Sequence, residues 1–316
     1  MLQLFTATLS PMLTMFLFMA LGYFMRKKHL LPENTDMVLS KLETMLLVPA
    51  VSLSVTLEYG TVKTYIDNLP TILYGLVAVL LAIGIAIPLS QLFGRQTSLY
   101  QRNIYRYALT FANYGFMGNA IVPLILNGDE ALFRYCLFTL PIGILTYFFG
   151  IPLLIPKEHR SSNPILGFFN PAICAWLLGL LLAITGATQY IPGFALSVVS
   201  SLKNCMGPIA MFLTGFVIAG FSWNEILADK KVYIATFLRL FVLPAVILVL
   251  LHLLGASKEI LALTFFAFAT PLGMNTVVYP ASYGMDTKTG AGMVTISHTL
   301  SVLSIPIMYT LFNIIF

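Results

Sequence analysis

Apolar residues form long stretches of this chain, and polar residues gather in the short segments between them. Apolar runs of about 20 residues are long enough to cross a bilayer as helices. We expect ten such spans, at residues 4–25, 38–57, 69–93, 106–126, 131–155, 170–188, 194–221, 231–254, 260–282 and 289–314. The spans at 106–126 and 260–282 are unusual because Asn, Gly and Pro interrupt both. The pattern predicts an all-α polytopic membrane protein.

Composition supports this class of protein and limits the kinds of partner that we expect. Of the 316 residues, 59% are hydrophobic and 9% are charged, whereas soluble domains carry about 25% charged residues. The first apolar run is followed, not preceded, by basic residues, so we expect a retained span and no cleaved signal peptide. The net charge of +5 then reflects orientation in the lipid bilayer, and we expect no nucleic-acid partner.

Basic residues in the loops predict the orientation. Lys and Arg concentrate on the cytoplasmic side of membrane proteins, so with ten spans both termini lie outside. The inner loops then hold Arg26, Lys27, Lys28, Arg95, Arg102, Arg106, Lys157, Arg160, Lys230, Lys231 and Lys288, and the outer loops hold Lys63, Arg134 and Lys258. Lys41 and Arg239 lie close enough to the inner face to extend their charges to it, and Lys203 lies deeper in its span.

The two halves of the chain repeat the same features in the same order. The interrupted spans both contain Leu-Thr-Phe, and an aspartate follows Pro123 and Pro280 by six residues in both cases. An odd number of spans per repeat reverses the orientation of the second copy, which gives an inverted repeat. The expected parts are a first five-helix repeat (1–155), a cytoplasmic linker (156–169) and a second five-helix repeat (170–316).

The interruptions predict a binding site. Proline removes a backbone donor and glycine resists unwinding poorly, and freed backbone groups are tolerated in a membrane only when buried or lining a cavity. Each break also exposes a half-helix N-terminus, which attracts anions. Alternatively, the asparagines only satisfy freed backbone groups. Candidate binding residues are Asn113, Asn119, Pro123, Asn275 and Pro280, and candidate helix-break or gating residues are Gly115, Gly118, Pro271 and Gly273.

Other chemistry is sparse. Glu43 is the acidic residue outside the predicted loops, near the inner end of its span, so we expect no intramembrane carboxylate site for cations. His298 lies well inside a span and is the candidate for proton coupling, although an interhelical hydrogen bond is the alternative. The three cysteines fit packing positions. We expect no cofactor, no metal and no enzymatic activity, and we interpret Asn170 as a helix cap.

Several segments resemble one known family. They are "LGYFMRKKHLLPE", "LSKLETMLLVPA", "NYGFMGNAIVP" and "PASYGMDTKTGAGMVTISHTLSVLSIP". In order and spacing they resemble the auxin efflux carrier family, which includes plant auxin exporters and bacterial permeases thought to carry malate or malonate. The short linker is similar to that of the bacterial members, which implies a bacterial inner membrane.

The resemblance implies an arrangement and a mechanism. Broken spans four and nine would cross, spans three to five and eight to ten would form a moving transport domain, and spans one, two, six and seven would form a scaffold that dimerises. The crossing would be flanked by Asn119 with Pro123 and by Asn275 with Pro280, and Asn113 and Tyr147 would lie nearby. The resemblance therefore adds Tyr147 to the candidate binding residues. The implied motion is an elevator mechanism.

The sequence thus predicts a secondary transporter or facilitated permease for a small organic anion, such as malate, malonate or an auxin-like acid, working by alternating access. Two alternatives stay open. A sodium-coupled organic-anion symporter would use Thr, Asn and carbonyl ligands at the breaks. A non-transporting membrane sensor would show no flux.

Overall fold

The computed structural model describes residues 2–93, 98–126, 128–159, 169–224 and 229–316. Their regular secondary structure is helical, and the one β-type contact among them is an isolated antiparallel bridge between Ala112 and Leu272. Seven helices are long and apolar enough to cross a membrane, namely Leu2–Lys27, Thr35–Tyr59, Leu69–Leu92, Asp129–Leu154, Gly193–Ile218, Lys230–Leu253 and Lys288–Ile315. The prediction of an all-helical polytopic membrane protein is confirmed.

The elements follow the predicted spans closely. The first half contains α1 (Leu2–Lys27), α2 (Thr35–Leu42), η1 (Glu43–Leu47), α3 (Val48–Tyr59), α4 (Val62–Asp67), α5 (Leu69–Leu92), α6 (Leu99–Thr110), η2 (Tyr114–Gly118), α7 (Asn119–Ile125), α8 (Asp129–Leu145), η3 (Thr146–Gly150) and α9 (Ile151–Leu154). The second half contains α11 (Pro171–Thr185), η5 (Ala187–Tyr190), α12 (Gly193–Ile218), α14 (Lys230–Phe237), η6 (Leu238–Val242), α15 (Leu243–Leu253), α16 (Lys258–Phe268), α17 (Asn275–Ser282) and α18 (Lys288–Ile315). Of the predicted linker, residues 160–168 lie outside the described residues, as does Arg95.

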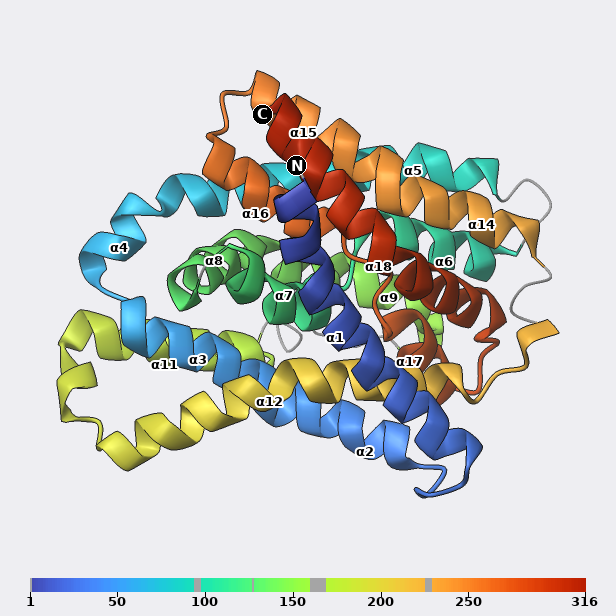
Figure 1. The fold of residues 1–316 in the computed structure, drawn as a ribbon, viewed down its shortest axis with the longest axis horizontal. Helices are drawn as coiled ribbons and strands as arrows, with labels where there is room; N and C mark the ends of the chain where they lie inside the picture. Colours follow the sequence, from blue (N-terminus) through green and yellow to red (C-terminus); the bar gives the residue numbers. More distant parts are fainter. Residues whose placement is uncertain (1, 94–97, 127, 160–168, 225–228) are drawn as a thin grey trace.

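The helices can be described as two groups, which also contact each other, most extensively through α1 and α18. In one group, α1 packs against α12, α11 packs against α3, and α3 contacts α12. The lower side of Figure 1 shows α2, α3, α11 and α12 of this group. In the other, α5 contacts α6 and α8, and α15 contacts α16. Small residues permit the closest approach between α1 and α12, because a Cβ at Gly22 or Gly215 would overlap the backbone of the facing helix. The second group holds both interrupted segments.

One ion pair connects the two groups at a partly exposed position. Lys203 of α12 pairs with Asp129 at the start of α8. The side chain of Lys203 is 9% exposed and that of Asp129 is 33% exposed. A second partly exposed cation, Arg134 of α8, pairs with Glu259 and Glu130 and so stays within the second group.

Two ionisable side chains are buried where the sequence pattern placed them near a membrane face. Glu43 in η1 is 0% exposed, and neither carboxylate oxygen has a hydrogen-bond partner among the described residues. Arg239 in η6 is 2% exposed. The prediction that Arg239 extends its charge to the inner face is therefore wrong, and Glu43 lies inside the helix bundle. Both residues occupy π-helical turns, which rotate the helix face locally and turn these side chains inward.

Candidate functional site: two broken helices at a polar cavity

The first break separates α6 from η2. Helix α6 ends at Thr110, Phe111 adopts an extended conformation (φ −108°, ψ 123°), and the helix resumes at Tyr114. The carbonyl of Asn113 then accepts from the N–H groups of both Met117 and Gly118 at 3.0 Å. Neither half-helix is long enough to cross a bilayer, because 12 residues extend about 18 Å.

The second break lies between α16 and α17, at residues 269–274, and it meets the first break directly. The Asn113 N–H donates to the carbonyl of Pro271 at 2.7 Å, beside the bridge between Ala112 and Leu272. The Leu272 N–H donates to the Ser297 hydroxyl of α18 at 3.0 Å. We call residues 111–113 and 269–274 together the crossing.

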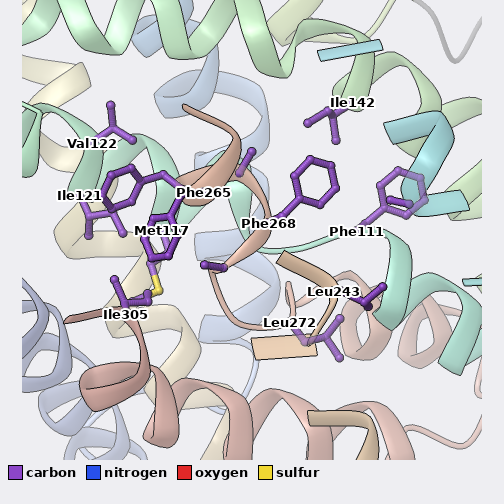
Figure 2. Packing of buried hydrophobic residues seen from close by; sticks show 14 of the residues in the cluster. Phe111, Met117, Ile121, Val122, Ile142, Leu243, Phe265, Phe268, Leu272 and Ile305 are labelled. Carbon is purple, nitrogen blue, oxygen red and sulfur yellow. The ribbon is translucent and has the colours of Figure 1, made fainter. Parts of the chain in front are cut away.

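Apolar side chains surround the crossing and exclude water from its backbone hydrogen bonds. Phe111, Phe268 and Leu272 belong to the same buried cluster, and Figure 2 shows them with their neighbours. Each of these side chains is at most 1% exposed. Because freed backbone groups are costly in an apolar environment, mutual pairing of the two breaks stabilises both of them.

A cavity of about 160 Å³ lies beside the crossing. The first residues of both second half-helices line it, namely Tyr114, Gly115, Phe116, Met274 and Asn275. The opposite wall comes from the other helix group, through Val48 and Ser52 of α3 and Trp176 of α11. The cavity therefore lies between the two groups of helices, and two helix N-termini end at it.

The structure brings most of the predicted site residues together. Those that line the cavity are Asn113, Gly115, Asn119, Tyr147, Gly273 and Asn275. Those that do not line it are Gly118, Pro123, Pro271, Pro280 and His298. Pro123 and Pro280 lie inside α7 and α17, beyond the breaks. Pro271 is part of the crossing itself, through its carbonyl.

The asparagines already make structural hydrogen bonds. The Asn275 amide donates to the Tyr107 hydroxyl at 2.7 Å, and the Asn119 amide donates back to the Gly115 carbonyl at 2.8 Å. Each amide nitrogen carries a second N–H. The Tyr107 hydroxyl, which accepts from Asn275, keeps its own proton to donate. These groups can therefore satisfy the protein backbone and still offer donors to a ligand.

His298 contacts the first break without lining the main cavity. Its Nδ1 lies 2.8 Å from the Val294 carbonyl, so this nitrogen must carry a proton and donate it. Its Nε2 lies 3.2 Å from the amide nitrogen of Asn113 and therefore accepts from it. The imidazole is neutral in this arrangement, with both nitrogens hydrogen-bonded, and it fixes the side chain of Asn113.

The glycines at the breaks differ in what surrounds them. A Cβ at Gly118 would overlap the hydroxyl of Tyr135, a residue that is 0% exposed. At Gly273 the nearest atom would be the Ala112 carbonyl oxygen at 3.6 Å, an ordinary contact, and at Gly115 nothing lies within 4 Å. Close approach thus requires glycine at Gly118 alone among these three positions.

Several lining residues carried no distinctive sequence signal. Tyr107, Tyr279, Thr139 and Thr146 line the cavity, but isolated Tyr and Thr residues are common in apolar helices. Asn170 is different, because its side chain accepts from the N–H groups of Ala172 and Ile173 at 3.1 Å. The prediction that Asn170 caps a helix is confirmed, and its position in the cavity wall could not be read from the motif.

The cavity lining is mostly apolar, includes amide and hydroxyl donors, and carries no formal charge among its described residues. Helix N-termini contribute partial positive charge, and amides and hydroxyls contribute hydrogen bonds. Groups of three or more His, Cys, Asp or Glu residues that could hold a metal ion do not occur within the described ranges. This arrangement suits a small anion better than a bare cation that needs carboxylate ligands.

Fold and site together define a polytopic helical membrane protein in which two broken helices cross beside a cavity that combines apolar surface with amide and hydroxyl groups. A family model described as membrane transport protein matches residues 7–161 and, a second time, residues 157–309. The chain belongs to this membrane transport protein family. The two matched ranges correspond approximately to the two halves of the chain. A search of curated proteins gave no match.

Proposed function

We propose that this chain is a secondary transporter or facilitated permease for a small organic anion, a carboxylate such as malate, malonate or an auxin-like acid. The observation that carries the proposal is the convergence of two half-helix N-termini on one cavity without formal charge. Two partial positive ends, with amide and hydroxyl donors between them, favour a carboxylate. The cavity volume of about 160 Å³ resembles cavities of about 150 Å³ that admit a benzene-sized ligand.

The proposed mechanism is alternating access by two inverted five-helix repeats in ten spans. The cavity wall is shared between the two helix groups, so sliding one group along the other would carry the site from one membrane face to the other. The ion pair of Lys203 and Asp129 joins the groups and would have to break during this motion. The group with α1, α3, α11 and α12 would be the stationary scaffold, and a second copy of the chain would pair with it.

Two other functions make different predictions. A sodium-coupled symporter would place an ion at the backbone carbonyls of the breaks, so sodium would be needed for uptake. A non-transporting sensor would bind an anion without flux. The amide and hydroxyl donors of the cavity favour anion binding in all three cases, and flux and sodium dependence separate them.

The test is uptake into proteoliposomes with purified protein, a set membrane potential, and labelled malate, malonate and indole-3-acetate. Asn275→Ala removes an amide that lines the cavity and is expected to reduce saturable uptake at least about tenfold, the effect of roughly 1.4 kcal/mol. Asn119→Ala is expected to act in the same direction.

Asn313→Ala is the matched control. The Asn313 amide donates to the Tyr309 carbonyl four residues earlier at 2.9 Å, the same local bond that Asn119 makes, but away from the cavity. Uptake by this variant should equal that of the unmodified chain. Absence of flux for every anion under every gradient would refute the proposed transport activity. Equal losses of uptake in all three variants would refute the placement of the binding site at the cavity.

A further inference from the structure

Arg239 is a buried cation with few partners. It lies in η6, within the long helix Lys230–Leu253, and is 2% exposed. Its Nη1 donates to the Leu109 carbonyl at 3.4 Å, while Nε and Nη2 have no hydrogen-bond partner among the described residues. A buried charge without a counter-charge is costly, and an ionisable group within a membrane segment is a functional residue by default.

The position of this contact matters because of helix dipoles. Each break brings one half-helix C-terminus and one N-terminus to the crossing, with opposite partial charges of about half a unit. The two kinds of end therefore offset each other. Carbonyl-bearing C-termini of broken helices are also the groups that coordinate Na⁺ in transporters, whereas the N-termini bind anionic groups. A symmetric crossing alone would thus favour neither sign of charge.

The two C-termini are not equivalent here. Leu109 is in the last turn of α6, and its carbonyl meets the guanidinium of Arg239. Phe266 is in the last turn of α16, and its carbonyl accepts from the neutral hydroxyl of Tyr135 at 3.4 Å. The C-terminus of α6 therefore has a full positive charge at its Leu109 carbonyl, whereas the C-terminus of α16 has only a neutral hydroxyl at its Phe266 carbonyl.

The half-helix C-terminus that Arg239 contacts ends beside the cavity. Leu109 lies two residues before the crossing, and Ala112 and Asn113 of the crossing line the cavity. Tyr107 lines the cavity and accepts from Asn275 at the start of α17. Since no described lining residue is charged, Arg239 supplies, at the C-terminus of α6, a formal positive charge that the cavity lining itself lacks.

We propose that Arg239 determines the sign of the charge that the substrate carries: by placing a positive charge at the Leu109 carbonyl, in the last turn of α6, it makes the crossing selective for anions and excludes Na⁺. This inference rests on the proposed transport of an organic anion and adds the residue that sets its specificity. Arg239 acts through the Leu109 carbonyl and is therefore a positioning and specificity residue that does not line the cavity. A sodium-coupled mechanism at the α6 carbonyls is incompatible with it.

The experiment compares Arg239→Gln with Arg239→Lys. Glutamine keeps a donor for the Leu109 carbonyl but removes the charge, and lysine keeps the charge. In proteoliposomes, Arg239→Gln is expected to raise the KM for malate about tenfold, equivalent to about 1.4 kcal/mol, with kcat changed less than about threefold. Arg239→Lys is expected to hold the KM within about threefold. Arg134→Gln, which removes a cation paired with Glu130 and Glu259, is the control for net charge.

A second readout is thermal stability in detergent with sodium chloride or N-methylglucamine chloride. Sodium should not shift the Tm of the unmodified chain, and should raise the Tm of Arg239→Gln. An unchanged KM in Arg239→Gln, or a sodium-dependent Tm in the unmodified chain, would overturn the inference. If Arg239→Gln does not fold, a tenfold higher KM in Arg239→Lys would overturn it. Anion flux that survives Arg239→Gln unchanged leaves the proposed function standing, whereas absence of flux in the unmodified chain removes both.

Discussion

The two breaks meet at one point but are stabilised differently, and the difference teaches how an approximate repeat becomes a specific site. At the first break, Asn113 contacts both Pro271 and His298 of the second repeat. At the second break, Asn275 contacts Tyr107 of the first repeat. Each break is therefore completed by the other half of the chain. The sequence similarity of the repeats predicts where helices break, while unlike partners decide what each break binds.

The largest effect expected from this comparison is at Gly118, beside the first break. Gly118→Ala places a methyl group against the buried hydroxyl of Tyr135, and overpacking of this kind costs about 1–3 kcal/mol. Gly273→Ala, at the second break, meets only an ordinary contact and should cost less than about 1 kcal/mol. Denaturant unfolding in detergent measures both. Equal costs would contradict the asymmetry in packing.

Tyr135 links the two breaks, and its hydroxyl gives the next largest effect. It donates to the Tyr114 carbonyl at 3.1 Å and to the Phe266 carbonyl at 3.4 Å, so Tyr135→Phe should cost about 1–2 kcal/mol. The same change removes the atom that a methyl group at Gly118 would overlap most, and leaves the ring carbon Cζ at 2.9 Å. The double variant Gly118→Ala with Tyr135→Phe should therefore be at least about 1 kcal/mol more stable than additivity predicts. Additive costs would exclude this hydroxyl as the source of the clash.

The smallest effect is expected for the hydrogen bond between Tyr107 and Asn275. Interhelical hydrogen bonds in membrane proteins contribute about 0.6 kcal/mol on average. A double-mutant cycle of Tyr107→Phe and Asn275→Ala should give a coupling energy near this value. The same cycle with Asn313→Ala, whose partner is Tyr309, should give a coupling within about 0.3–0.5 kcal/mol of zero. A larger coupling in the control cycle would mean that the variants perturb the whole bundle.

Local patterns were sufficient for the helices. Hydropathy placed the third span at 69–93, and the helix occupies Leu69–Leu92. The same is true of the interruptions, since both broken segments were recognised from Asn, Gly and Pro. Apolar periodicity and helix-breaking chemistry are properties of neighbouring residues, so the sequence expresses them directly.

The position of the breaks could not be predicted in the same way. The expected break residues were Gly115, Gly118, Pro271 and Gly273, and of these only Pro271 and Gly273 lie in a break. Gly115 and Gly118 lie in η2, and the helices also continue through Pro123 and Pro280. One proline removes one backbone donor, which a membrane helix tolerates when neighbours supply partners. Residues 111–113 break instead because their backbone finds Pro271, far away in sequence. The depth of Arg239 was mistaken for a related reason, since the carbonyl that it contacts belongs to another helix.

The hydrogen bond between Asn113 and Pro271 has a consequence for how the chain is made. These residues lie 158 positions apart (271 − 113), and ribosomes add about 5–20 residues per second. The backbone of the first break is therefore synthesised roughly 8–30 s before Pro271, its hydrogen-bond partner. During that time its free backbone groups need another donor or acceptor, because unpaired groups are costly in lipid. Synthesis of the first repeat thus creates a membrane intermediate that only the second repeat can complete.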